Sequence, residues 1–443
     1  MMKISEMPKY EVYKDSGVEW LGDIPASWSL LANKHIFRLK KKQVGKRSSE
    51  YDLLSLTLRG VIKRDMENPE GKFPAEFDTY QEVRCGDFIF CLFDVEETPR
   101  TVGLSPFNGM ITGAYTVFEL NDNFDNRFLY YFYMNLDAKK MLKPLYRGLR
   151  NTIPKDSFLS FKTFVPPHEQ QTRIANFLDK KTALIDEAIS IKEKQISLLK
   201  ERKQIIIQQA VTQGLDPNVP MKDSGVDWIG KIPEHWEVKR IKHVGKIING
   251  YAFPSDAFIQ EGARVMKISN IQTMRLDWSD SSYVDALWLD KTAQFRIYKG
   301  DLVFALTRPV ISTGIKAALV DTDEPILLNQ RNAVFRPNDT CDKNWIYFVL
   351  LTKGFINDFE MQIDITGQQP NISTVAIGNL PFPLPPELEQ KVIVSDLSRR
   401  CALLDMAVDD QIAQIERLKE YKTSLINSAV TGKIKITPEM VEQ

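Results

Sequence analysis

The stretch that decides the fold occurs twice in the chain. Residues 14–28 read KDSGVEWLGDIPASW, and residues 222–236 read KDSGVDWIGKIPEHW. Ten of these 15 positions are identical at a constant separation of 208 residues, and His35 and His243 keep the same separation. Internal repetition of this length is the signature of a duplicated structural unit. We therefore expect His35 and His243 to have a structural role and not a catalytic one.

A second repeated stretch opens a long amphipathic segment in each copy. Residues 166–171 read PPHEQQ and residues 385–390 read PPELEQ, 219 residues apart. Apolar residues then recur in an a/d heptad pattern, which predicts two long helices that pair as a coiled coil. The predicted pairing residues are Leu178, Ile185, Ile189, Ile196, Leu199, Ile206, Leu397, Leu404, Val408, Ile415, Leu418 and Leu425.

Polar residues interrupt both heptad patterns at matching places, Lys192 with Gln411 and Lys203 with Lys422. Isolated polar residues of this kind fix the register of a coiled coil. A chain with two equivalent halves most simply folds with approximate two-fold symmetry, which makes the two helices antiparallel. Each helix would be about 60 Å long and would hold the flanking blocks at a fixed separation. The alternative is that each helix packs on its own block as an amphipathic surface helix.

The blocks between the repeats have little sequence in common, and the second is longer. Each nevertheless predicts a buried strand after a Gly-Asp turn, at 88–90 and 302–304, and a late helix, near 128–142 and 345–359. The predicted fold class is α+β: two tandem mixed α/β domains separated by two long helices. The expected domain bounds are 1–165, 166–213 for the first helix, 214–384, 385–432 for the second helix, and 433–443 for a tail.

Composition excludes several classes of protein. The 443 residues are 43% hydrophobic and 26% charged, which is typical of a soluble globular chain. We find no run of about 18 apolar residues that would span a membrane and no signal-peptide core. Four cysteines without a C-x-x-C pair, and four histidines, predict neither a disulfide framework nor a metal site. We therefore expect a reduced, cytoplasmic protein.

Catalytic motifs are missing from the sequence. Residues 225–232 approach a phosphate-binding loop, but Ile232 lacks the hydroxyl that such a loop needs, so a structural turn with buried Trp20 and Trp228 is favoured. Asp94, Glu96 and Glu97 form an acidic cluster without a following lysine at nuclease-like spacing, which favours a solvated turn. We expect no catalytic residue, no metal and no cofactor.

Basic charge is segregated although the net charge is zero. Residues 29–47 carry seven bases and no acid, and residues 143–155 carry four bases and no acid. Such patches suit contact with DNA phosphates, for which the candidates are Lys40, Lys41, Lys42, Lys46, Arg47, Arg147 and Lys155. Forked donors suited to base edges are Arg59, Lys63, Arg64, Arg150, Asn270, Arg275, Arg308, Gln330, Arg331, Gln368 and Gln369.

These features together resemble the specificity subunit of type I restriction–modification enzymes over essentially the full chain. The resemblance rests on the repeated 14–28 and 222–236 stretches, on GQQPNIS at 367–373 and on LPPELEQ at 384–390. The first copy departs from the pattern, because residues 148–154 read GLRNTIP where the second copy has GQQPNIS.

The resemblance implies a non-catalytic DNA reader. Each block would be a target recognition domain for one half of a bipartite, asymmetric site in double-stranded DNA, and the helices would set the gap. The implied partners are two modification subunits, which use S-adenosylmethionine, and ATP-driven restriction subunits. Two other functions are weighed against it: a coiled-coil scaffold that binds proteins without DNA specificity, and a nuclease that uses the Asp94 cluster.

Overall fold

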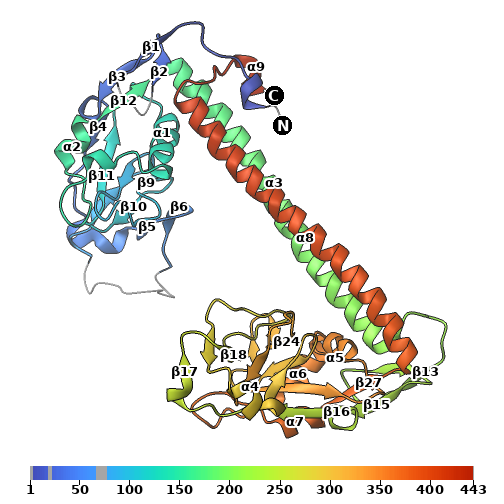
Figure 1. Ribbon diagram of the computed structural model, residues 1–443. Coiled ribbons are helices and arrows are strands. Elements are labelled where there is room, and N and C mark those ends of the chain that lie inside the picture. The colour runs from blue at the N-terminus through green and yellow to red at the C-terminus, as the bar shows by residue number, and fades with distance from the viewer. Residues whose placement is uncertain (1–2, 18–21, 66–76, 443) are drawn as a thin grey trace. The chain divides into compact units, whose positions relative to one another are not determined.

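The computed structural model describes residues 3–17, 22–65 and 77–442. The chain divides into two compact units, Met1–Lys192 with Ala413–Gln443, and Glu193–Ile412. Each unit holds one mixed α/β block and one portion of each of two long helices, α3 (His168–Gln213) and α8 (Glu387–Val430) (Figure 1). Both helices begin just after a Pro-Pro pair, whose fixed backbone suits the first turn of a helix.

The two long helices lie side by side within each unit (Figure 1). In the first unit, Lys422 forms an ion pair with Asp186 at 2.7 Å, and Lys192 donates a hydrogen bond to Gln414. Since residue numbers rise along α3 as they fall along α8, these segments run antiparallel. In the second unit, Lys203 pairs with Asp405 at 2.7 Å. The predicted polar interruptions Lys192, Lys203 and Lys422 therefore bind the opposite helix.

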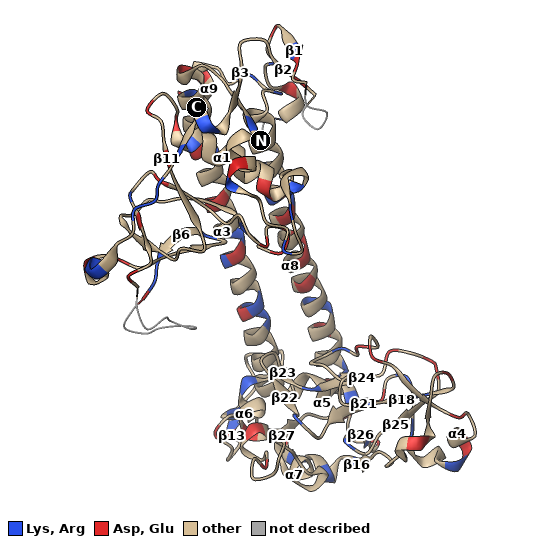
Figure 2. Ribbon diagram, turned by 90° about the vertical axis from the view of Figure 1, so that its left-hand side faces the viewer, with Lys and Arg blue, Asp and Glu red and all other residues tan. Residues whose placement is uncertain are grey.

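The predicted pairing residues are all shielded from solvent to some degree. Six are buried, namely Leu178, Ile185, Leu397, Ile415, Leu418 and Leu425, and the other six are half-buried. Charged residues of both signs alternate along the remaining faces (Figure 2). This distribution is what an apolar stripe with a heptad repeat produces when it meets a second helix.

The block of the first unit is built on a four-stranded antiparallel sheet in the order β4-β11-β8-β9. Helix α1 packs against β9, and a buried aromatic cluster of Phe37, Phe88, Phe90, Phe118, Tyr133 and Phe158 fills the core. The strands are β1 (Tyr13–Asp15), β2 (Asp23–Pro25), β3 (Ser29–Ala32), β4 (Phe37–Leu39), β5 (Leu54–Thr57), β6 (Gly60–Lys63), β7 (Gln81–Val83), β8 (Phe88–Phe90), β9 (Val102–Leu104), β10 (Gly109–Ile111), β11 (Thr116–Leu120) and β12 (Lys162–Val165). The short helices are α1 (Asn126–Ala138), α2 (Lys155–Ser160) and the C-terminal α9 (Pro438–Glu442).

The block of the second unit contains a sheet of the same kind, in the order β16-β26-β21-β24, and a five-stranded sheet in the order β17-β19-β18-β25-β20. Its strands are β13 (Met221–Asp223), β14 (Lys231–Pro233), β15 (Glu237–Arg240), β16 (Gly245–Asn249), β17 (Phe258–Ile259), β18 (Ala263–Met266), β19 (Ser282–Val284), β20 (Arg296–Ile297), β21 (Leu302–Ala305), β22 (Val310–Ile311), β23 (Gly314–Ile315), β24 (Ala317–Leu319), β25 (Ile326–Leu328), β26 (Asn332–Pro337) and β27 (Pro381–Leu384). Its helices are α4 (Trp288–Lys291), α5 (Lys343–Val349), α6 (Lys353–Met361) and α7 (Thr374–Asn379).

The predicted strands and the first predicted late helix are confirmed. Strands β8 and β21 are buried at every residue, as expected of strands covered on both faces. The second late helix, predicted over 345–359, is wrong as one helix, because the chain forms α5 and α6 with a break at 350–352. At this break the Thr352 hydroxyl donates to the Val349 carbonyl at 2.7 Å, a local bond that competes with helix continuation.

The final tryptophans of the repeated stretches occupy the same place in both units, at the end of a long helix. Trp28 and Trp236 are fully buried, and each lies against the glycine that ends a long helix. A Cβ added at Gly214 (φ +76°) would lie 3.3 Å from the Trp236 ring, and one added at Gly432 (φ +73°) would lie 3.4 Å from the Trp28 ring. Each glycine therefore ends its helix in a left-handed conformation, and a Cβ at Gly432 would first meet Pro25, at 2.4 Å.

Buried glutamines join each long helix to the late helix of its block. Gln171 accepts from the Asp125 backbone N–H at 2.9 Å, and Gln390 accepts from that of Asp342 at 2.8 Å. Asp125 and Asp342 are the N-caps of α1 and α5. Gln171 and Gln390, the last residues of the PPHEQQ and PPELEQ stretches, thus hold each long helix against the late helix of its block.

Trp20 lies outside the described residues. Trp228 is half-buried, which corrects the expected burial, and its ring packs edge-to-face on Phe355. Within the described residues, every helix is too short or too polar to cross a bilayer.

Candidate nucleic-acid interface

The second unit has an open cavity of about 550 Å³ beside the end of β21. Four of the base-reading candidates line it: Gln330, Arg331, Gln368 and Gln369. They come from the turn before β26 and from the loop between α6 and α7, segments that lie apart in the sequence. The remaining lining residues are Asn249, Leu306, Thr307, Asn371, Ile372, Ser373 and Thr374. Amide and guanidinium groups of this kind match the hydrogen-bonding edges of adenine and guanine.

Backbone hydrogen bonds join two loops at this cavity. The Arg308 N–H donates to the Pro370 carbonyl at 2.8 Å, and the Ile372 N–H donates to the Leu306 carbonyl at 2.9 Å. The Thr307 hydroxyl adds a bond to the Asn371 side chain at 2.9 Å. We call residues 306–308 together with 367–373 the second loop pair. Its GQQPNIS run is therefore fixed against the sheet, and Gln368 stays exposed.

The first unit contains the corresponding arrangement. The Asp94 N–H donates to the Arg150 carbonyl at 3.0 Å, and the Ile153 N–H donates to the Leu92 carbonyl at 2.8 Å. Residues 92–94 together with 148–154 form the first loop pair. The GLRNTIP run thus takes the place that GQQPNIS takes in the second unit, although the two runs share few residues.

The tip of the first loop pair is basic and apolar. Arg147 and Thr152 exchange two backbone hydrogen bonds, of 2.9 and 3.1 Å, which close a tight hairpin around residues 148–151. Leu149 is fully exposed at this tip, and Arg147, Arg150 and Lys155 are exposed beside it.

The basic segment of residues 29–47 is only partly available to a ligand. Lys41, Lys46 and Arg47 are exposed, and Lys46 and Arg47 lie in a 3-10 turn over Gly45–Glu50. Lys42 pairs with Glu82 at 2.6 Å, and this hydrogen bond lowers the pKa of the Glu82 carboxyl to about 2.

Lys40 is corrected from a phosphate contact to an internal ion pair. Its side chain is buried, and its ammonium lies 2.7 Å from Asp87 and 3.8 Å from Glu119. Its burial and its two acidic partners leave the ammonium unavailable to a phosphate. Lys40 and Asp87 lie 47 positions apart, so the sequence alone does not show that they are partners.

The β5–β6 hairpin carries three further candidates. Arg59 is exposed at its turn. Lys63 pairs with Asp52 at 2.6 Å and lies over the Phe107 ring at 5.4 Å, and Arg64 is half-buried. Arg59 is thus the most accessible of the three.

Asn270 is corrected from a base-reading candidate to a structural residue. It is fully buried, its amide donates to the Asp277 and Asp280 carbonyls at 2.9 Å, and its oxygen accepts from the Lys267 N–H at 2.8 Å. The amide and oxygen of Asn270 therefore bind the backbone of its own loop and are buried away from a base. Arg275, in that loop, is exposed.

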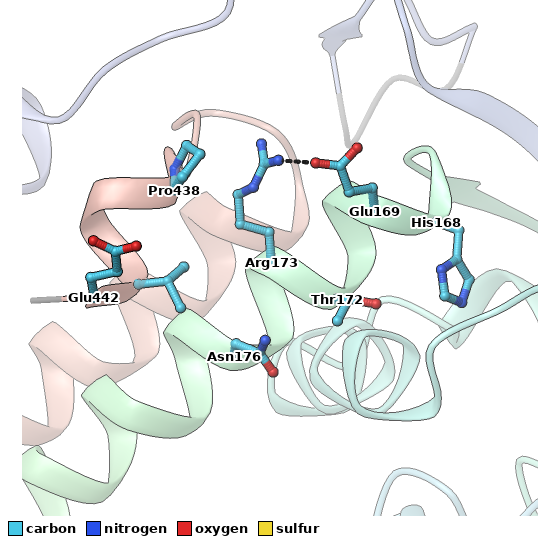
Figure 3. A pocket seen from close by; sticks show the side chains of 8 residues that line it. His168, Glu169, Thr172, Arg173, Asn176, Pro438 and Glu442 are labelled. Carbon is cyan, nitrogen blue, oxygen red and sulfur yellow. Dashed lines mark hydrogen bonds and ion pairs between the residues drawn. The ribbon is translucent and has the colours of Figure 1, made fainter.

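A second cavity, of about 560 Å³, lies at the start of α3, where the C-terminal helix α9 packs (Figure 3). Its labelled lining residues include His168, Arg173 and Glu442, and Arg173 forms an ion pair with Glu169. Lys180 donates to the carbonyls of Val441 and Glu442 at 3.2 and 2.9 Å. The contacts anchor the C-terminus, and no predicted site residue lies there.

The three buried cysteines are poorly suited to nucleophilic catalysis, and Cys85 is exposed. Burial raises the pKa values of the Cys91 and Cys401 thiols and raises that of Cys341 to about 12. The thiolate, which is the reactive form, is thereby disfavoured. In the acidic cluster, Glu96 forms an ion pair with Lys143. Across residues 3–17, 22–65 and 77–442, no group of three His, Cys, Asp or Glu side chains is arranged to hold a metal ion.

Comparison with known proteins gives one consistent family. The family model described as "Type I restriction modification DNA specificity domain" matches residues 102–201 and 233–417. The type I restriction enzyme MjaVIII specificity subunit of Methanocaldococcus jannaschii is 30% identical over 312 residues, which cover 70% of each chain. The EcoAI specificity subunit of Escherichia coli is 29% identical over 199 residues, 44% of this chain and 33% of that one.

Solved structures show the same fold. A chain from a study of complex assembly and conformational transition of the type I R-M system superposes with a TM-score of 0.70 at 15% identity, covering 92% of this chain and 98% of that one. The HsdS subunit from Thermoanaerobacter tengcongensis superposes with a TM-score of 0.54 at 16% identity, covering 93% and 98%.

Proposed function

The chain belongs to the family of type I restriction–modification DNA specificity subunits, and from this premise we infer that each of its two units reads one half of a bipartite DNA target. DNA recognition is the role of this family, and methyl transfer and cleavage lie on other subunits. The observation that carries the half-site assignment is the loop pair, which recurs in both units: Asp94 and Arg308 each donate to the late loop, Leu92 and Leu306 each accept from its isoleucine, and the side chains differ. Two units that share a backbone arrangement and differ in side chains suit a DNA target whose two halves differ in sequence. We place the protein in the cytoplasm, with the DNA that it reads.

The proposed readers are the accessible candidates in each block. In the first unit they are Arg59, Lys63, Arg64 and Arg150, and in the second they are Arg275, Arg308, Gln330, Arg331, Gln368 and Gln369. Lys41, Lys46, Arg47, Arg147 and Lys155 are the proposed phosphate contacts, and Lys42, which Glu82 already holds, is proposed as a weaker one. Phosphate contacts position the protein on the duplex, whereas contacts to base edges select the sequence.

The function is tested by binding of the assembled complex to DNA across a salt titration. Specific binding must fall steeply with salt, since phosphate contacts release counterions. A scaffold that binds only proteins would show no such slope. Cleavage of plasmid by the purified chain with Mg²⁺ alone would instead support the nuclease alternative.

Removing the exposed bases of the first unit should weaken binding without altering sequence preference. We expect the triple change Lys41→Ala, Lys46→Ala and Arg47→Ala to reduce the log–log salt slope by about 2 to 3, since each phosphate contact contributes about 0.9. Affinity for specific and random DNA should fall together. The measurement is fluorescence anisotropy over a salt series.

Lys42→Ala is the matched control, because Glu82 already pairs with the Lys42 ammonium. It should change the slope less than any one of the three substitutions does. A triple variant with altered base preference and an unchanged slope would refute the phosphate assignment.

We further propose that α3 and α8 form an antiparallel coiled coil that sets the gap between the half-sites, in an approximately two-fold symmetric subunit with the domain bounds given above. The ion pairs Asp186–Lys422 and Lys203–Asp405 support the pairing, as does the burial of the a/d residues. An amphipathic helix packed only on its own block would not need polar partners on the other helix.

The proposed partners are two modification subunits and, with them, the restriction subunits. Exposed apolar residues on α3 support a docking surface for the former. Leu184 and Ile191 in the first unit are 50% and 49% exposed, and Leu198 and Ile205 in the second are 63% and 49% exposed. Their seven-residue spacing places each pair on one helix face, the arrangement that an amphipathic partner helix recognises. Each unit would thus receive one modification subunit.

Charging this face should weaken assembly. We expect the double change Leu184→Glu and Ile191→Glu to lower affinity for the modification subunit at least about 10-fold, a loss of roughly 1.4 kcal/mol. Ala183→Glu with Ser190→Glu is the matched control, since both positions are exposed on α3 at the same spacing. Analytical ultracentrifugation of the mixed subunits measures the effect. Equal assembly by both double variants would exclude this face.

A further inference from the structure

The two loop pairs place an acidic residue and a basic residue at the same backbone position. Strands β8 and β21 are central strands of their four-stranded sheets. Asp94 lies four residues after the end of β8, and Arg308 lies three residues after the end of β21. Each donates its backbone N–H to the late loop, to Arg150 at 3.0 Å or to Pro370 at 2.8 Å. Two residues earlier, Leu92 and Leu306 accept from the isoleucine of that loop. Asp94 and Arg308 are therefore corresponding residues.

Both residues hold the same rare backbone conformation. Asp94 has φ +45° and Arg308 has φ +48°, in the left-handed region that residues other than glycine seldom adopt. Aspartate tolerates this region, but arginine has no such preference. Strained residues of this kind gather at functional sites when the surrounding structure holds them in place. Here the loop pair holds them, in two blocks whose sequences have little else in common.

Their side-chain charges are not used within the protein. Arg308 is exposed and Asp94 is half-buried. Among the residues that the structure describes, neither the carboxylate nor the guanidinium has a hydrogen bond or an ion pair. Nearby charges are engaged, as Glu96 is with Lys143 and Lys42 is with Glu82. Both groups are thus free to meet a ligand at the loop pair.

On DNA, opposite charges at one position select different base edges. A carboxylate only accepts hydrogen bonds, and in the major groove it fits the exocyclic amine of cytosine. A guanidinium only donates, and it fits the O6 and N7 atoms of guanine. The basic neighbours Arg147, Arg150 and Lys155 would offset repulsion between Asp94 and the phosphates.

We propose that Asp94 and Arg308 are corresponding specificity-determining residues, Asp94 accepting from a cytosine amine in one half-site and Arg308 donating to a guanine in the other. The inference rests on the proposed function and deepens it, because it adds Asp94 to the base readers and assigns one base edge to each residue. The acidic turn at Asp94 would then take part in base recognition by the first unit.

The test is a methylation screen with the complex of this chain and its modification subunits. Libraries randomise one half-site at a time, and methylated sites are sequenced. Asp94→Asn keeps the shape and tolerates the backbone conformation but adds a donor. It should reduce discrimination at a single C·G pair by about 5- to 150-fold, the range of one good base contact. The other half-site should be unchanged. Arg308→Asn should have the mirror-image effect, at one G·C pair of the other half-site.

Two further variants make the test decisive. Asp94→Gly suits φ +45° and removes the carboxylate, so it should fold and still lose the cytosine preference even if the asparagine variant folds poorly. Glu97→Gln removes an equal charge three residues away and should leave every base preference intact.

Unchanged preferences in Asp94→Gly and Arg308→Asn would overturn the inference, and so would altered preferences in both half-sites from one variant. A wild-type complex without salt-dependent specific binding would instead overturn the proposed function itself.

Discussion

Replacing residues 30–165 with the equivalent block of a relative is expected to change one half of the methylated target and leave the other half as it was. The structure gives this exchange well-defined joints. Strand β3 pairs with β12, with Leu30 opposite Phe164 and Ser29 opposite Val165, so both ends of the block lie side by side. The second block closes in the same way through β15 and β27. An exchange at these strands leaves both long helices intact.

The donor block should retain the hydrogen bonds that cross its joint. Tyr131 in the block donates to Asp179 of α3 at 2.8 Å, the Asp125 N–H donates to Gln171 of α3 at 2.9 Å, and Tyr131 and Gln171 are buried. A donor without these partners would leave buried polar groups unsatisfied, at a cost of about 1–3 kcal/mol each. A hybrid chain that does not fold would then be mistaken for one that folds but does not recognise its half-site.

The measurement is sequencing of methylated sites after reconstitution with the modification subunits. Because each half-site contact set contributes several kcal/mol of discrimination, the exchanged half should change completely. The unexchanged half provides the internal control, and the reciprocal exchange across β15 and β27 should change that half instead. A single exchange that altered both halves, or a target that is continuous or palindromic, would mean that the blocks are not separate readers.

Lengthening both long helices by one heptad is expected to abolish tight binding to the original target. The insertions lie between Lys192 and Ile196 and between Gln411 and Ile415. Seven residues add about 10 Å at 1.5 Å each, close to three base pairs at about 3.4 Å per pair. A whole heptad keeps the a/d residues facing the partner helix, so the pairing is preserved.

The loss of affinity follows from the helical geometry of DNA. Three added base pairs rotate one half-site by roughly a third of a turn, given about 10.5 pairs per turn. Affinity for the original site should therefore fall at least about 10-fold, or about 1.4 kcal/mol. A target with a longer gap should recover part of the binding, and the base identities in both halves should stay the same.

A screen over gap lengths with constant half-sites measures this effect. An insertion of seven residues into α3 alone is the control, because it displaces the rest of α3 by about 10 Å along α8, separates ion-pair partners such as Lys203 and Asp405 and should destabilise the chain. Replacing the exposed residues around Lys192 without changing the length should leave the preferred gap unaltered. If the lengthened chain kept its original gap and full affinity, the helices could not be the spacer.

The long helices and the central strands could be predicted because their signals are local. A seven-residue apolar repeat specifies a helical face within a few turns, and α3 begins and ends within a few residues of the span expected from that repeat. Phe88–Phe90 and Leu302–Phe304 were recognisable as strands because short apolar runs follow Gly-Asp turns. The single helix predicted over 345–359 was wrong because a side-chain hydrogen bond at Thr352 interrupts an otherwise helical pattern.

The candidate site was only partly predictable, because the availability of a polar group depends on partners far away in the chain. Gln330, Arg331, Gln368 and Gln369, proposed from their side-chain chemistry alone, line one cavity. Lys40 and Asn270 have equally suitable side chains, but Asp87 and the backbone around Asp277 engage them inside the protein. Composition cannot separate these cases, since burial decides whether a charge or an amide meets a ligand.

The sequence alone therefore determined the duplication, the helices and the family, all of which follow from repeats and from periodicities of the local backbone. The correspondence of Asp94 with Arg308 came only from the folded chain. Opposite residue types in dissimilar segments gave no signal for it, and the hydrogen bonds that align them join strands and loops more than 50 residues apart. Long-range backbone pairing set these two positions, and the residue types at them were free to diverge.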